Sequence, residues 1–318
     1  MSSVDLTQKD RGRVTDRGFW LLCIAAGVTV LVVLAAILVS TVNEAWPAFS
    51  VEFFTSAKWI PNQVAGGNPV FGSLAFLYGT VVVSLISLVI AVPVSLGIAL
   101  FISELAPRRV RGPIVTVIDL LASVPSVVFG LWGVLVVAPK LVPIYRWLHD
   151  VLGGIPLIGS LFGEVSSGRN FMTAGVILSI MVIPIITSIS REVFDTVPDS
   201  DKQAAYALGA TRWEMIRGAM LPHSFGGIVG AIMLGLGRAM GETIAVALVI
   251  GSAVQISANL LTSGYTIPAV IVDQFNEAGG DYLSALIGMG VVLFVLTTIV
   301  NLLARIVVRR AEIRMKGA

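Results

Sequence analysis

Long apolar runs separated by short polar segments form the main pattern along this chain. A helix that crosses the apolar core of a membrane, about 30 Å thick, takes about 20 residues. Apolar runs of that length lie near residues 18–42, 72–104, 113–139, 171–190, 224–255 and 282–308. Runs of this length are typical of helices whose backbone hydrogen bonds are satisfied internally in lipid. We therefore predict an all-α, polytopic transmembrane helix bundle of six spans.

The composition also indicates a membrane protein. Of the 318 residues, 56% are hydrophobic and only 13% are charged, and the mean hydropathy is +0.92. In soluble proteins, charged residues alone make up about a quarter of the chain. The single cysteine, Cys23, cannot form an intrachain disulfide. The two histidines, His149 and His223, are predicted to lie on opposite sides of the membrane, so we expect no metal centre.

The positions of Lys and Arg predict how the chain is oriented. Sixteen of the 21 basic residues fall in the N-terminus, in the loops after the second and fourth runs, and in the C-terminus. Short loops rich in Lys and Arg stay on the cytoplasmic side. We therefore expect a cytoplasmic tail at 1–17, a six-span transmembrane domain at 18–308 with a cytoplasmic loop at 191–222, and a cytoplasmic tail at 309–318.

The polar loop at 191–222 carries the signals of a first short helix. Asp199 or Ser200 can cap its start, and Gly209 can end it in the left-handed conformation that other residues disfavour. The side chains along this helix suit insertion into a groove on another protein. They are small or apolar: Ala204, Ala205, Ala207 and Leu208.

A second helix is predicted directly after Gly209. Thr211 followed three residues later by Glu214 is a capping-box pattern, and we expect Pro222 to mark the far end of this helix. The loop is therefore interpreted as helix, tight turn and helix. Such a unit between two membrane spans indicates a docking element.

Two charges, Arg238 and Glu242, lie near the middle of the fifth apolar run. Placing an arginine at that depth costs at least about 2.5–3.5 kcal/mol. Residues four apart share one helical face, so the two can pair. The forked guanidinium of Arg238 suits an oxyanion, and Glu242 can accept a hydrogen bond from the hydroxyl of hydrogen phosphate. The alternative is a buried ion pair that only holds helices in register.

Small residues in the same run predict that another helix approaches it closely. They form two pairs with the spacing of helix-packing motifs: Gly226 with Gly230, and Gly237 with Gly241. This span is therefore expected to be central in the bundle.

The chain lacks a nucleotide-binding loop. That loop needs the pattern G-x-x-x-x-G-K-[ST], and no Gly-Lys pair occurs here. Any ATP hydrolysis must then be done by another subunit. We predict no enzymatic activity and no cofactor in this chain, with ATP and magnesium bound by a partner ATPase.

Several segments together identify a family resemblance. Residues 203–216, QAAYALGATRWEMI, resemble the EAA loop of ABC importer permeases, with Gln203 where the pattern has Glu. SVPSVVFGLWG at 123–133, LSIMVIPIITSISREVF at 178–194 and LGRAMGETIAV at 236–246 are similar to the PstC permeases of bacterial phosphate-specific ABC importers. One departure is IGSA at 250–253, where the family more often has Asn after Gly251.

The resemblance implies the type I architecture of ABC importer permeases and a multi-pass location in the bacterial plasma (inner) membrane. It also implies three partners: a PstA-like permease that completes a heterodimeric pore, a PstB-like ATPase dimer and a PstS-like phosphate-binding protein. By the same resemblance, Arg238 and Glu242 belong to the substrate pathway. The residues implied in coupling to the ATPase are Gln203, Ala204, Ala205, Leu208 and Gly209.

Two alternatives stay open at this point. An ABC permease for another oxyanion, sulfate or molybdate, would carry the same EAA-like loop, and the intramembrane Arg238 and Glu242 argue against it. A secondary transporter needs no cytoplasmic docking helix and usually shows an internal repeat of spans, which we do not find. The residues alone also allow two copies of this chain to form the pore.

Overall fold

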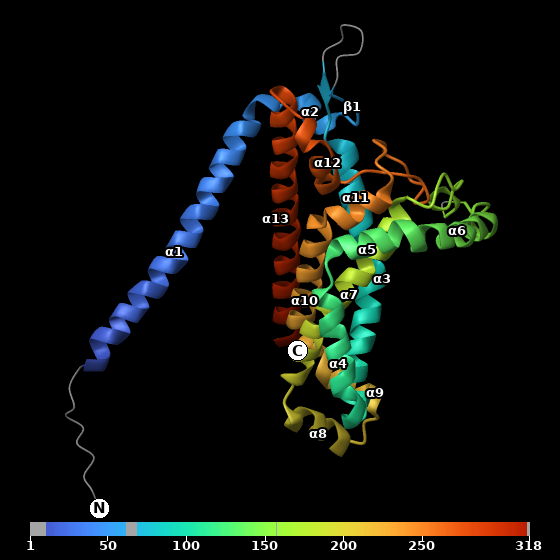
Figure 1. Cartoon of the computed structure of the whole chain (residues 1–318). Coiled ribbons are helices and arrows are strands. Elements are labelled where there is room, and N and C mark those ends of the chain that lie inside the picture. Colours follow the sequence, from blue (N-terminus) through green and yellow to red (C-terminus); the bar gives the residue numbers. More distant parts are fainter. Residues whose placement is uncertain (1–10, 62–68, 157, 317–318) are drawn as a thin grey trace, which may run out of the picture.

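The computed structural model is a helical bundle (Figure 1), described for residues 11–61, 69–156 and 158–316, with backbone only at 11–15 and 311–316. Its long helices are α1 (Arg11–Ala45), α3 (Leu74–Leu100), α7 (Phe171–Asp195), α10 (Leu221–Gly241) and α13 (Asp281–Lys316). Its shorter helices are α2 (Val51–Thr55), α4 (Arg108–Ser123), α5 (Ser126–Trp132), α6 (Ala138–Leu152), α8 (Asp199–Ala207), α9 (Arg212–Met215), α11 (Ile244–Ile250) and α12 (Ile267–Gln274). Two short strands, β1 (Trp59–Ile60) and β2 (Val70–Phe71), pair antiparallel with Trp59 opposite Phe71.

Within the described part of the chain, six helical segments are long and apolar enough to span a membrane: Asp16–Ala48, Leu74–Leu105, Ser126–Leu152, Phe171–Asp195, Arg212–Gly241 and Asp281–Arg310. The predicted all-α class and the predicted number of spans are confirmed. The bounds of the third and fifth spans differ from those expected. The third apolar run is interrupted at Pro125, and the fifth span begins earlier, at Arg212, and ends at Gly241.

The third apolar run contains a break at Pro125. α4 ends at Ser123, and Val124 adopts an extended backbone with ψ 129 before helix resumes at Ser126. A proline disfavours helical geometry in the residue before it, so the helix ends there. Beyond the break, α5 and α6 run across the bundle, whereas α4 runs along it (Figure 1). The apolar run predicted as one span at 113–139 is therefore divided between two helices, and the segment long and apolar enough to cross a membrane is Ser126–Leu152.

Helix α7 forms the centre of the bundle, between α3 and α10 (Figure 1). About 61% of its apolar stretch is buried, more than in the other five spans, as expected for a helix packed within a core. Close approach to its neighbours depends on glycine. A Cβ at Gly175 would lie 2.4 Å from Ile86 of α3, and a Cβ at Gly235 of α10 would lie 2.7 Å from Ile186 of α7.

The glycine pairs predicted to pack in the fifth run do not do so within the described chain. A Cβ added at Gly230, Gly237 or Gly241 would meet no other atom within 4 Å. The tight contacts of α10 with α7 are made by Gly227 and Gly235 instead. Spacing alone does not say which glycines face a neighbour within the chain, and Gly230, Gly237 and Gly241 stay open to a helix from outside it.

The two ends of the bundle differ. At one end lie α2, the β1–β2 hairpin, α12 and the start of α13, packed around a cluster that includes Phe53, Trp59 and Phe76. There the Tyr265 hydroxyl donates to Asp273 Oδ2 at 2.7 Å. Burial, followed by this carboxylate, raises the pKa of Tyr265 above its usual range, so the phenol stays a donor.

The opposite end of the bundle holds α8 and α9, the beginning of α1 and the end of α13 (Figure 1). The start of α1, the end of α13 and the polar loop therefore lie toward the same end of the molecule, although α1 starts well apart from the other two (Figure 1). Helix α1 stands apart from the rest of the bundle along most of its length and meets it near the end that holds α2 (Figure 1).

Candidate functional site

The polar loop folds into a separate short helix, α8, at one end of the molecule (Figure 1). Gly209 follows it with φ +82, the left-handed conformation predicted for the turn. The N-cap position is Pro198, without a side-chain hydrogen bond, so the prediction that Asp199 or Ser200 caps the helix is wrong. Asp199 is instead the first helical residue, where its negative charge interacts favourably with the positive end of the helix dipole.

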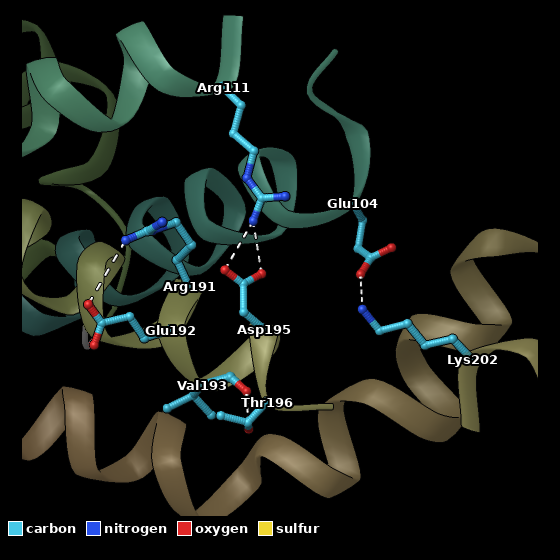
Figure 2. Close-up of polar contacts among 8 residues, drawn as sticks. All are labelled: Glu104, Arg111, Arg191, Glu192, Val193, Asp195, Thr196 and Lys202. Carbon is cyan, nitrogen blue, oxygen red and sulfur yellow. Dashed lines mark hydrogen bonds and ion pairs between the residues drawn. The ribbon is translucent and has the colours of Figure 1, made fainter. Parts of the chain in front are cut away.

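Helix α8 is held against the bundle by an ion pair and by packing. Lys202 Nζ donates to Glu104 Oε1 at 2.7 Å, and these side chains are only 18% and 13% exposed (Figure 2). Glu104 lies in the π-helical turn Phe101–Leu105 that continues α3. Ala205 packs against a cluster that includes Phe194 at the end of α7. A movement of α8 would therefore displace groups that contact both α3 and α7.

The other side of α8 is open. Gln203 and Ala204 are exposed, and Leu208, directly after the helix, is 89% exposed. Gly209 is exposed as well. We call these four residues the docking face. The predicted coupling residues are thus together, except that Ala205 points toward the bundle.

The second predicted helix begins as expected and ends elsewhere. The Thr211 amide donates to Glu214 Oε2 at 2.7 Å, and the Glu214 amide donates to Thr211 Oγ1 at 3.4 Å, which is a capping box. However, Pro222 lies in the first turn of α10, directly after the π-helical turn Ile216–Met220, and the helix continues to Gly241. A π turn changes the hydrogen-bond pattern just where proline lacks a donor, so Pro222 does not end the helix.

A second ion pair lies near α8. Arg111 Nη2 donates to both carboxylate oxygens of Asp195, at 2.9 and 3.0 Å, and joins the start of α4 to the end of α7 (Figure 2). Both side chains are substantially exposed. Exposed pairs contribute about 0–1 kcal/mol to stability. The more buried Lys202–Glu104 pair is therefore the stronger candidate for a mechanical connection.

The structure does not join Arg238 and Glu242. Helix α10 ends at Gly241, and Glu242 has an extended backbone with φ −69 and ψ 126. The Glu242 carboxylate instead accepts from the Ala245 amide at 3.4 Å, in the first turn of α11. No ion pair connects the two side chains in the described chain. The expectation that they share one helical face is wrong, because the helix breaks between them.

Arg238 is exposed and lines an open-sided cavity of about 770 Å³ between α10 and α13. Its walls are glycine and apolar residues of α10, the last part of α13 and one residue of α7. Its polar lining residues are Arg238, Asn301, Arg305 and Arg309. Glu242 does not line it, and neither does any other acidic residue that the structure describes. The cavity can therefore hold an anion in contact with arginine.

Sequence reasoning missed Arg305 and Arg309 as site residues. Both were counted only as basic residues that fix the orientation of the last span. Their spacing of four places them on one helical face, which was the available signal. That this face turns toward Arg238 depends on the packing of α13 against α10, which the sequence does not state.

Comparisons with known proteins agree on the family. Residues 91–313 match the family described as binding-protein-dependent transport system inner membrane component. The phosphate transport system permease protein PstC of Xylella fastidiosa strain Temecula1 is 46% identical over 299 residues, which cover 93% of this chain and 91% of that protein. PstC of Mesorhizobium japonicum is 42% identical over 321 residues, covering 98% and 95%.

Solved structures agree on the fold. A bacterial ABC transporter involved in the import of the acidic polysaccharide alginate contains a chain that superposes with a TM-score of 0.61 at 16% identity, covering 95% of this chain and 99% of that one. The MetNI methionine ABC transporter, in an inward-facing conformation, contains a chain with a TM-score of 0.51 at 16% identity, covering 76% and 94%. With six apolar spans and an α8 docking face, this chain belongs to the binding-protein-dependent transport system inner membrane components and, among them, to the PstC permeases of phosphate transport systems.

Proposed function

We propose that this chain is a transmembrane permease subunit of an ATP-driven importer that carries inorganic phosphate. The observation that carries the proposal is the arginine-lined cavity beside α10, in a chain of the PstC family. An arginine guanidinium offers planar, forked donors that match the oxygens of phosphate. As a permease, the chain is a transport protein and not an enzyme.

Coupling to ATP hydrolysis is assigned to the docking face of α8. Closure of a partner ATPase dimer, PstB-like in this family, would press on Leu208 and the exposed side of α8. The Lys202–Glu104 ion pair would pass that displacement to α3, and Ala205 would pass it to the end of α7. ATP and magnesium are assigned to the ATPase.

The remaining partners follow from the same proposal. A PstA-like permease would complete the pore, and a PstS-like protein would deliver phosphate at the end that holds α2 and α12. The end that holds α8 would then face the cytoplasm together with both termini. The membrane would be the bacterial inner membrane.

In the pathway, Arg238 would contact the transported anion in the cavity, and Glu242, which lies past the end of α10 and does not line the cavity, would be a separate pathway contact. A carboxylate disfavours a fully deprotonated anion such as sulfate, whereas it accepts a hydrogen bond from hydrogen phosphate. The Glu242→Gln variant should therefore transport phosphate less well relative to sulfate than the native complex. Unchanged uptake and selectivity in this variant would remove Glu242 from the pathway.

The test of the proposed function is ATP-dependent uptake of radiolabelled phosphate by vesicles that hold the whole complex. Native vesicles should accumulate phosphate, and excess sulfate should not compete. Arg238→Gln should lower uptake by about tenfold or more, since charged hydrogen bonds are worth about 1.5–3 kcal/mol. Co-purification of the ATPase checks that the variant assembles. Competition by sulfate or molybdate would assign another oxyanion, and full uptake by Arg238→Gln would make this arginine structural.

A further inference from the structure

The cavity between α10 and α13 contains two arginines for which neither the family resemblance nor the proposed pathway gives a role. Arg305 and Arg309 line it from α13, and Arg238 lines it from α10. Asn301 adds an amide that can donate or accept. The rest of the lining is glycine and aliphatic. None of the ion pairs formed by the described side chains includes any of these arginines.

The course of the helices places the arginines in order along the cavity. α10 and α13 run in opposite directions, and the end of α13 lies near α8 (Figure 1). The lining of α10 extends from Gly226 to Arg238, which is about 18 Å at 1.5 Å per residue. Arg309 therefore lies toward the α8 end, Arg305 lies one turn deeper, and Arg238 lies toward the opposite end.

The thickness of the membrane indicates that Arg305 and Arg309 lie at a different depth from Arg238. Arg305 follows Asp281, the first residue of α13, by 24 positions, which is about 36 Å along the helix. That exceeds the apolar core of about 30 Å, so Arg305 and Arg309 reach the membrane surface on the α8 side. Charged side chains at the membrane surface cost little free energy, and basic residues there help to orient a span. A role in orientation alone does not require Arg305 and Arg309 to line a cavity. Arg310 has the same charge on the same helix and does not line the cavity.

We propose that Arg305 and Arg309 form a second binding site for a phosphate group, on the α8 side of Arg238. Residues four apart on one helix present their guanidinium groups side by side, and together they can hold two oxygens of one phosphate. The ligand is either inorganic phosphate leaving the pathway or the phosphate of a membrane lipid headgroup. The assignment of inorganic phosphate rests on the proposed function.

The experiment measures binding and transport in the complete complex with three variants. They are Arg305→Gln with Arg309→Gln, the milder Arg305→Lys with Arg309→Lys, and the control Arg310→Gln. Equilibrium binding of radiolabelled phosphate is measured in nanodiscs of phosphatidylcholine. Retention of phosphatidylglycerol is measured by native mass spectrometry from nanodiscs that contain both lipids. The amount of co-purified ATPase shows whether each complex assembles.

We expect the double Gln variant to bind one of these two ligands about tenfold or more weakly, because it loses charge-assisted hydrogen bonds. The double Lys variant should keep part of this binding, and Arg310→Gln should bind as the native complex does. Loss of phosphate binding identifies the free anion, and loss of phosphatidylglycerol identifies the lipid; either supports the site. Native binding of both ligands by an assembled double Gln variant overturns it.

The two proposals fail in different ways. If native vesicles take up no phosphate, the proposed function fails, whatever the α13 variants do. If native vesicles take up phosphate, Arg238→Gln abolishes uptake and the double Gln variant binds both ligands normally, only the second site is wrong.

Discussion

Two consecutive residues after α11 adopt left-handed backbone, Gly251 with φ +92 and Ser252 with φ +54. In the part of the chain that the structure describes, Ser252 is the only residue other than glycine with a positive φ. The family resemblance implies Asn more often at this position, and Asn tolerates this conformation better than Ser. The departure seen in the sequence therefore concerns a strained bend, at some distance in the chain from the docking face and from Arg238.

Replacing Gly251 with alanine should destabilise the protein. The backbone strain alone costs about 1–2 kcal/mol, and the added Cβ would lie 2.6 Å from Ser263 Oγ and 2.9 Å from the Arg169 carbonyl oxygen. Thermal unfolding of the purified complex should show a clearly lower midpoint for Gly251→Ala. The control is Gly97→Ala in α3, where a Cβ meets nothing within 4 Å. Equal midpoints for Gly251→Ala and the native complex would contradict the account.

Helix α8 has two different sides. Leu208 at its end is exposed, whereas Lys202 on its inner side is held to Glu104 by an ion pair. The turn at Gly209 and the capping box of Thr211 and Glu214 were predictable, because their signals lie within a few residues of each other. The Lys202–Glu104 pair was not, because its partners lie 98 positions apart. The break at Glu242 was also missed, since the hydropathy of the run continues through it.

The break before Pro125 follows from the restriction that proline places on Val124, so it can be read from the sequence. In contrast, the cavity contact of Arg305 and Arg309 needs the packing of α13 on α10. Local patterns thus gave the fold class and the docking turn, whereas the composition of the candidate site required the packed structure.

Leu208→Asp should prevent binding of the ATPase. Leu208 is 89% exposed at the end of the docking face, and burying a carboxylate in an apolar groove is strongly unfavourable. The amount of ATPase that co-purifies with the permease should fall about tenfold or more. The control is Val51→Asp, which changes a residue that is 81% exposed at the opposite end of the bundle. Normal ATPase recovery with Leu208→Asp would place the contact elsewhere.

Breaking the Lys202–Glu104 pair should uncouple ATP hydrolysis from transport. Either Lys202→Glu or Glu104→Lys brings like charges together at the base of α8, and the loss of a charged hydrogen bond costs about 1.5–3 kcal/mol. Phosphate uptake per ATP hydrolysed should fall several-fold in each single variant and recover in the charge-swapped double variant. The matched swap at Arg111 and Asp195, which are more exposed, should change this ratio little. Single and double variants with equally low coupling would show that these charges act independently.

The molecule as a whole consists of a packed bundle and one separate helix. The core surrounds α7, whereas the most apolar stretch of α1 is not buried against the rest of this chain. Exposed apolar residues on a span are expected to face lipid or another subunit. The glycines of α10 that meet no neighbour within the chain have the same character. Both features leave surface of this chain open to lipid or to another subunit.

The separation of α1 makes this protein suited to magnetic resonance without any sequence change. Cys23 is the one cysteine of the chain, and it is exposed on α1. A spin label attached there therefore reports from a single, known position. Its spectrum should be mobile in the isolated chain in detergent and should broaden when the second permease assembles against α1. An unchanged spectrum on assembly would mean that α1 remains in lipid at this depth.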